Sequence, residues 1–172
     1  YRLYKNTRML EGIFMKFSTK NIAIAAIIAA IYAVITIVIA PLSYGMMQLR
    51  FSEALTILPV FTPVAIPGLF IGCLIANLLS PVGAVDIIFG SLASLISAIG
   101  TYKLRNNMWL APLPPVVVNA VVVGIMLKYY YGVDASLVLC MLWVAGGQAV
   151  ACYGLGLPLK KLLDKHKNIF DA

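Results

Sequence analysis

The chain has 172 residues, of which 62% are hydrophobic and only 11% are charged, and its mean hydropathy is +0.98. Soluble domains carry about a quarter charged residues, so this composition excludes a soluble globular domain. Thirteen Lys and Arg against six Asp and Glu give a net charge of +7, but the basic residues are sparse and lie at the ends of long uncharged runs. Nucleic acid is therefore not an expected partner, because binding it needs a basic stripe or patch.

Long uncharged runs predict the architecture. Residues 21–49, 54–85, 87–102, 106–127 and 135–159 contain no charged side chain. A bilayer core of about 30 Å takes about 20 apolar residues per helix, and the backbone polar groups within it must pair internally. The runs also lack the two-residue alternation of a membrane barrel. We therefore predict an all-α integral membrane protein with one compact intramembrane domain and the lipid bilayer as its surroundings.

Prolines and glycines divide this domain into six predicted transmembrane helices. In chain order they cover residues 20–40, 47–61, 63–79, 86–102, 114–129 and 134–159. Pro41, Pro63 and Pro81 mark three of the boundaries, since proline removes a backbone donor. The run 54–85 is too long for one ordinary span and short for two. Two helices joined at Pro63 therefore require Arg50 and Glu53 to lie inside the first of them.

The distribution of charge predicts the orientation. With both termini in the cytoplasm, Arg50 and Lys128 are the basic residues at the outer side, and the acidic Glu53, Asp86 and Asp134 fall in the outer half. This asymmetry follows the positive-inside rule. The basic residues then placed in the cytoplasm are Lys16, Lys20, Lys103, Arg105, Lys160, Lys161, Lys165 and Lys167. We expect a multi-pass protein of the plasma membrane.

The N-terminal stretch differs from the rest of the chain. Residues 1–14 precede Met15 and Lys16, which look like a natural start, and they lack the long apolar stretch of a signal peptide. We expect residues 1–14 to be an upstream extension or a cloning remnant, with an interfacial segment as the alternative. Residues 15–172 then form the single six-helix domain.

Signals for catalysis, metals or nucleotides are missing from the sequence. Cys73, Cys140 and Cys152 lie inside predicted helices without metal-ligand spacing, and the single histidine, His166, belongs to the basic tail. No P-loop occurs, so the chain is not expected to hydrolyse ATP by itself. The sequence predicts no metal, no cofactor and no catalytic residue, and we do not expect an enzyme.

Small residues form a stripe on the first predicted helix. Ala25, Ala29 and Ala33 repeat every four residues, with Ala26 and Ala30 beside them. Such spacing lets another helix approach closely in lipid, so we predict a docking surface for a partner. Packing within the same bundle is the alternative. A similar stripe of Gly68, Gly72 and Ala76 on the third helix favours internal packing.

Polar residues at membrane depth predict a binding site. Arg50 and Glu53 are three residues apart, hence on one helical face, and ionisable groups there are costly enough to be functional by default. A plain ion pair between them is the alternative. Other polar residues in apolar surroundings are Gln48, Asn77, Asp86, Asn119 and Gln148. For Asn119, interhelical hydrogen bonding is equally expected.

The sixth predicted helix suits a flat ligand. Gly146 and Gly147 precede Gln148, and Trp143 and Tyr153 lie on either side of them. Backbone exposed by the glycines and an aromatic ring nearby would let a planar molecule lie against the helix.

Two stretches of the chain resemble a known family. The first is YGMMQLRFSEALTILPVFTPVAIPGLFIGCLIANLLSPVGAVDIIFGSLAS, and the second is WLAPLPPVVVNA, preceded by TYKLR. They closely resemble the queuosine-precursor transporter family QueT, the substrate-binding S components of energy-coupling factor (ECF) importers. The resemblance covers residues 15–161, and runs such as LRFSEAL and WLAPLPPV are specific.

This resemblance implies a fold, partners and a place for the site. S components are six-helix membrane proteins that bind a scarce nutrient from outside and associate with a coupling transmembrane subunit and two ATPase subunits. Their first helix carries an alanine stripe facing the coupling subunit, which here matches Ala25, Ala29 and Ala33. The site lies in the outer half under the loop between helices one and two, here 41–49, with Ser43, Tyr44, Gly45 and Gln48.

The resemblance also implies the ligand, a 7-deazaguanine base. Its guanine-like edge offers two adjacent N–H donors that a carboxylate accepts, so Glu53 is the candidate, and Asp86 suits a cationic aminomethyl group. The O6 acceptor would be read by one of Arg50, Asn77, Asn119 and Gln148, as amides and arginines read guanine. Stacking would come from Trp143, Tyr44 or Tyr153. The aminomethyl base, queuine and a nucleoside form all stay open.

Other classes of function remain as alternatives. A stand-alone secondary transporter of a small heterocyclic nutrient would also have six helices and buried charges, and it would couple to protons through Glu53 or Asp86. A membrane enzyme lacks an obvious nucleophile and base. A purely structural subunit leaves Arg50, Glu53 and Asp86 without a role.

Overall fold

The computed structural model describes residues 18–44, 49–80 and 83–165. Every regular element in this part is a helix, and it contains no strand, which confirms the all-α prediction. The elements in chain order are α2 (Thr19–Val38), α3 (Ala40–Ser43), η1 (Phe51–Val60), α4 (Ala65–Asn77), η2 (Asp86–Gly90), α5 (Ser91–Lys103), α6 (Leu113–Tyr129), α7 (Leu137–Ala149), η3 (Val150–Leu155) and α8 (Gly156–Asp164). Residues 1–14 and Gln48 lie outside the described residues.

Three elements differ in winding from ordinary α-helices. η1 is a 3-10 helix of 10 residues, and η2 and η3 are π-helical turns. η2 leads directly into α5, and α7, η3 and α8 form one continuous helix of 28 residues. That helix continues beyond the predicted end at residue 159 to Asp164, which pairs with Lys160 one turn earlier at 2.8 Å.

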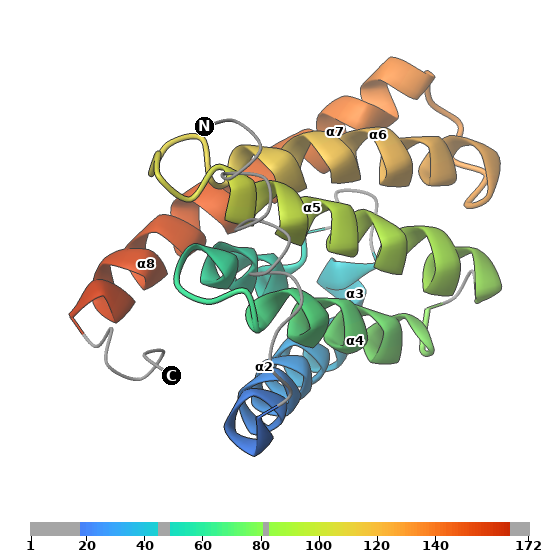
Figure 1. Ribbon diagram of the computed structural model, residues 1–172. Coiled ribbons are helices and arrows are strands. Elements are labelled where there is room, and N and C mark those ends of the chain that lie inside the picture. Colours follow the sequence, from blue (N-terminus) through green and yellow to red (C-terminus); the bar gives the residue numbers. More distant parts are fainter. Residues whose placement is uncertain (1–17, 45–48, 81–82, 166–172) are drawn as a thin grey trace, which may run out of the picture.

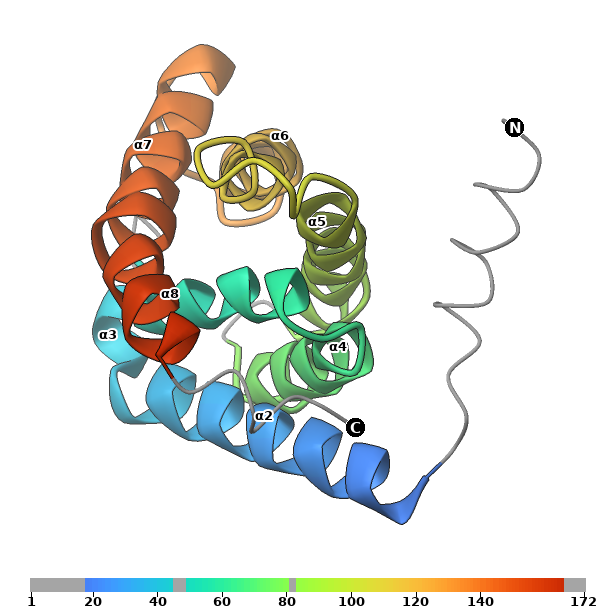
Figure 2. The ribbon, with the colours of Figure 1, turned by 60° about the vertical axis from the view of Figure 1, so that its left-hand side comes forward.

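The helices pack in sequence around η1. α4 contacts α2 and α5, α6 contacts α5 and α7, and these neighbours lie side by side in Figure 1. Figure 2 shows η1 crossing the interior of the ring that the longer helices form, where it contacts α2, α4, α5, η3 and α8. The segment that carries Arg50 and Glu53 is therefore at the centre of the molecule.

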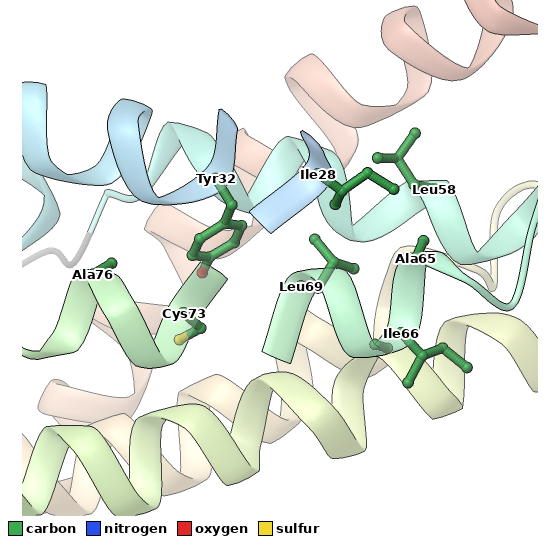
Figure 3. Close-up of a cluster of buried hydrophobic side chains, with 9 residues drawn as sticks. Ile28, Tyr32, Leu58, Ala65, Ile66, Leu69, Cys73 and Ala76 are labelled. Atoms are coloured by element: carbon green, nitrogen blue, oxygen red, sulfur yellow. The ribbon is translucent and has the colours of Figure 1, made fainter. Parts of the chain in front are cut away.

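Two glycines allow α2 and α4 to approach closely. A Cβ atom on Gly68 would lie 2.8 Å from the carbonyl oxygen of Ala25, and one on Gly72 would lie 2.8 Å from that of Ala29. Around this contact Ile28 and Tyr32 pack on Leu69 and other buried residues of α4 (Figure 3). The glycine stripe therefore serves internal packing, as the sequence favoured.

The surface and the helix lengths point to a membrane protein. α2 and the continuous helix Leu137–Asp164 are long and apolar enough to cross a membrane, while η1, α4 and α6 are shorter apolar helices. Aliphatic side chains such as Val38 and Leu142 are exposed on the isolated chain, as lipid-facing side chains would be. The six spans and the cytoplasmic termini stay predictions.

Candidate functional site

The winding of η1 aligns its polar side chains. A 3-10 helix has 3.0 residues per turn, so side chains three apart eclipse one another. Glu53 and Thr56 accordingly form one row, Arg50 is the residue that precedes the helix, and all three are buried. The Thr56 hydroxyl donates to the carbonyl of Glu53 at 2.6 Å, and such side-chain bonds compete with the α-helical ladder. Arg50 and Glu53 are thus both buried at the start of η1, which is a tighter helix than predicted.

Glu53 is held by a tyrosine of α2. The hydroxyl of Tyr32 donates to Oε1 of Glu53 at 2.5 Å. The other carboxylate oxygen, Oε2, is buried and has no hydrogen-bond partner among the described residues. In that part of the chain the ion pair within 4.0 Å is Lys160–Asp164, so Arg50 and Glu53 do not form the salt bridge considered as an alternative.

Arg50 reaches α4 instead of a carboxylate. Its Nε donates to the carbonyl of Ser43 at 3.3 Å, and Nη1 lies 3.9 Å from the sulfur of Cys73. The guanidinium lies 5.3 Å from the centre of the Tyr44 ring. Tyr44 is itself fixed, because its hydroxyl donates to the carbonyl of Ala76 at 2.5 Å. A buried cation with these neighbours is available to an acceptor group of a ligand.

Asn77 connects this region to Asp86. Its Nδ2 donates to the backbone carbonyl of Asp86 at 2.8 Å and contacts the sulfur of Cys73 at 3.4 Å. Its Oδ1 is buried without a hydrogen-bond partner among the described residues. Gly90 makes room for this amide, since a Cβ there would lie 2.8 Å from Nδ2.

The carboxylate of Asp86 is bound by hydroxyl groups. Oδ2 accepts a hydrogen bond from Tyr131 at 2.5 Å and another from Ser80. Asp86 is buried, and no basic residue of the described part lies within salt-bridge distance of it. It begins the π turn η2, a type of turn that is frequent at functional sites.

These contacts bring six residues together in what we call the polar cluster: Tyr32, Arg50, Glu53, Cys73, Asn77 and Asp86. Cys73 is central, because Arg50 and Asn77 both contact it and the ring of Tyr32 points toward it from α2 (Figure 3). The cluster offers one cation, two carboxylates and one amide oxygen. Such a set can hydrogen-bond a polar ligand through both donors and acceptors.

Other predicted site residues form no hydrogen bond to a side chain of the polar cluster in the described part of the chain. Gln148 is buried, and its Oε1 accepts a weak bond from Cys152, whose sulfur also contacts the carbonyl of Glu53. The hydroxyl of Tyr153 donates to the carbonyl of Trp109 at 2.9 Å, so it faces the α5–α6 loop. Asn119 is buried on α6 and Trp143 is half-buried on α7. Within the described residues no hydrogen bond links either of them to the cluster.

The predicted docking residues divide between two sides of α2. Ala29 and Ala33 are 4% and 5% exposed, and Ala25 and Ala29 face the glycines of α4. Ala26 and Ala30 are exposed on the isolated chain. Ala25, Ala29 and Ala33 therefore lie toward the bundle, and Ala26 and Ala30 lie on the outer side of α2.

Tyr131, which bonds Asp86 of the polar cluster, makes the stability of the protein depend on pH. It lies in the loop after α6, and burial, followed by its hydrogen bond to Asp86, raises its pKa to about 12 from an ordinary value near 10. A raised pKa of the folded state contributes stability below about pH 10 that is lost as the pH rises toward 12. We expect the melting temperature of the detergent-solubilised protein to fall more steeply over this range than that of Tyr131→Phe.

The control for this measurement is Tyr129→Phe, since Tyr129 is 68% exposed. The melting temperature of Tyr129→Phe should fall with rising pH in the same way as that of the unmodified protein. If the melting temperatures of the unmodified protein and Tyr131→Phe fall equally steeply between about pH 10 and 12, the coupling between Tyr131 and Asp86 is contradicted.

Comparisons with known proteins identify the family of the chain. The profile of the family described as QueT transporter matches residues 22–165. The chain belongs to the QueT transporter family. One curated relative is the queuosine precursor transporter QueT of Lactococcus lactis subsp. cremoris (strain MG1363), which is 39% identical over 83 residues. These residues are 47% of this chain and 48% of the relative, so the match spans about half of each. No solved structure matches the chain.

Membership of the QueT family confirms the resemblance found in the sequence. A transporter family, together with the apolar helices, supports a membrane protein and argues against an enzyme.

The sequence analysis missed two members of the polar cluster, Tyr32 and Cys73. Both lie in apolar helices, where an aromatic ring or a thiol is expected to pack against other apolar groups. A signal for Tyr32 was present, because a buried tyrosine hydroxyl usually has a hydrogen-bond partner.

Proposed function

We propose that the chain is the membrane-embedded substrate-binding component of an ECF-type importer and that it captures a queuosine precursor, a 7-deazaguanine base, from the outer side. The observation that supports this proposal is the polar cluster of a QueT-family helical protein: Arg50 is buried, and Glu53 Oε2 and Asn77 Oδ1 are buried without a hydrogen-bond partner among the described residues. The printed name of the Lactococcus lactis relative supports the choice of ligand.

Each part of the cluster suits one part of such a base. Glu53 Oε2 accepts an N–H of the guanine-like edge, which is a charge-assisted hydrogen bond. Arg50 donates to the O6 acceptor, and Tyr44, whose ring lies against Arg50, offers a stacking surface. Asp86 receives the cationic aminomethyl group. In a site removed from water each of these bonds gains strength, which compensates the cost of burying the charges.

The energy for transport comes from other subunits in this proposal. The sequence holds no nucleotide-binding motif, so a coupling transmembrane subunit and two ATPase subunits supply ATP hydrolysis. The coupling subunit docks on the exposed face of α2, at Ala26 and Ala30. The chain crosses the plasma membrane six times with both termini in the cytoplasm and does no covalent chemistry.

One observation favours a second candidate, a secondary transporter that works alone. Glu53 and Asp86 are buried, and neither forms a salt bridge within the described residues, as expected of carboxylates that carry protons. Such a protein would move its heterocyclic substrate with protons instead of ATP.

Reconstitution into liposomes distinguishes the two candidates. The protein is purified with and without the coupling subunit and ATPases, and uptake of radiolabelled 7-aminomethyl-7-deazaguanine is followed. We expect uptake only when the coupling subunit and the ATPases are present and ATP is supplied on the side of the membrane where the ATPases lie. Uptake by the protein alone under a proton gradient would establish the second candidate. The mass of any small molecule that copurifies identifies the precursor.

A further inference from the structure

Tyr32 is the largest fully buried side chain of the described residues, and it comes from a different helix than Glu53. It lies on α2, 21 residues before Glu53, and is 0% exposed. Its ring packs in the core between α2 and α4, so its position is set by the close approach of those helices at Gly68 and Gly72 (Figure 3). The hydroxyl is thereby a fixed donor.

The hydrogen bond from the Tyr32 hydroxyl fixes the Glu53 carboxylate directly. Oε1 accepts from Tyr32 at 2.5 Å, while Oε2 has no hydrogen-bond partner in the described part of the chain. A glutamate side chain has three rotatable bonds, and an unrestrained one loses rotamer freedom when a ligand binds. A carboxylate that is already oriented does not incur that loss.

We infer that Tyr32 is a specificity-determining positioning residue: it orients Glu53 so that Oε2 faces the N–H donors of a guanine-type edge. The inference rests on the proposed function, in which Glu53 reads a 7-deazaguanine base. Tyr32 does not contact the ligand in this arrangement. It acts through Glu53, and its contribution is greatest for ligands that offer two adjacent donors.

A pair of ligands isolates this contribution. 7-Aminomethyl-7-deazaguanine offers a ring N–H and an exocyclic NH2 at one edge, and 7-aminomethyl-7-deazahypoxanthine offers the ring N–H alone. Damage to packing weakens the binding of both. Loss of carboxylate orientation weakens the binding of the guanine-type ligand more than that of the other ligand. The ratio of the two affinities therefore reports how well the Glu53 carboxylate is positioned.

The variant that removes the donor is Tyr32→Phe, which keeps the ring. By calorimetry in detergent we expect the unmodified protein to prefer the guanine-type ligand by about tenfold or more, and Tyr32→Phe to reduce that preference to about threefold or less. In a Glu53→Gln background, Tyr32→Phe should change the ratio no further, since the two residues act as one unit.

Thr36→Val is the matched control. Thr36 lies one turn after Tyr32 on α2 and is buried, and its hydroxyl donates to the backbone carbonyl of Tyr32 at 2.8 Å and bonds Ser52 of η1 at 2.6 Å. The variant removes a hydroxyl from the same interface but keeps the hydroxyl of Tyr32 that bonds Glu53. The control should leave the ratio unchanged. If Tyr32→Phe fails to fold, Glu53→Asp takes its place: it keeps the charge and the tyrosine but withdraws the carboxylate from the hydroxyl, and the ratio should fall in the same way.

An unchanged ratio in folded Tyr32→Phe, or an equal fall in Thr36→Val, overturns the positioning role while the proposed function stands. If the unmodified protein binds neither ligand, the proposed function itself fails, and the inference fails with it.

Discussion

Replacing Glu53 with glutamine is expected to weaken binding of 7-aminomethyl-7-deazaguanine by about 30-fold or more. One accepting oxygen becomes an NH2 group that faces ligand donors, and the charge that strengthens the bond is lost. Leaving buried donors without an acceptor costs about 2 kcal/mol, which corresponds to that factor. Calorimetry of the detergent-solubilised protein measures the change directly.

The control for Glu53→Gln comes from the same row of η1. Thr56→Val removes a buried hydroxyl that bonds the carbonyl of Glu53 but leaves the carboxylate and its bond to Tyr32 in place. It should lower thermal stability with little effect on affinity. If Glu53→Gln binds the base as tightly as the unmodified protein does, Glu53 is not in the site.

Ala30→Trp is expected to abolish ATP-dependent uptake while leaving ligand affinity within about twofold. Ala30 is exposed on α2, so an indole there blocks the close approach of a partner helix without entering the bundle. Ala29 is unsuitable for this test. Its Cα lies 3.0 Å from the position of a Cβ on Gly72, so a large side chain would separate α2 from α4.

A second exposed position on the same helix controls for the added bulk. Val38 is 75% exposed at the end of α2, away from the alanines, and Val38→Trp should support normal uptake. Uptake and binding are compared in the reconstituted system. If Ala30→Trp lowers affinity as much as uptake, or leaves uptake intact, the face at Ala26 and Ala30 does not dock the partner.

The helices could be predicted because their causes are local. A long apolar run needs internal backbone pairing in lipid, and prolines interrupt it, so the predicted helix 20–40 corresponds to α2 and the predicted helix 63–79 corresponds to α4. The boundary predicted at Pro41 agrees with the structure: α2 ends at Val38, and Pro41 lies in the first turn of the next helix, α3, where its missing amide costs nothing.

The contacts of the site depend on residues far apart in the chain. The three-residue spacing of Arg50 and Glu53 predicted a shared face, and both are buried at the centre of the molecule. Their partners could not be predicted from spacing, because Tyr32 reaches Glu53 from another helix and Arg50 approaches Cys73 across 23 residues. The sequence also could not determine which alanine face of α2 packs against α4, because Ala25 and Ala26 are the same residue type on two sides of that helix.

Each of the π turns η2 and η3 winds one more residue into its helix than an α-helical turn would. Because α5 follows η2 without a break, that surplus residue decides which side of α5 turns inward. Without it, α5 would rotate by roughly 100° about its axis, and the buried hydroxyls of Ser91, Ser94 and Ser97 would leave the interior. A change of chain length within Asp86–Gly90 would therefore alter which side chains of α5 face the interior, so the number of residues in this segment matters as much as their chemistry.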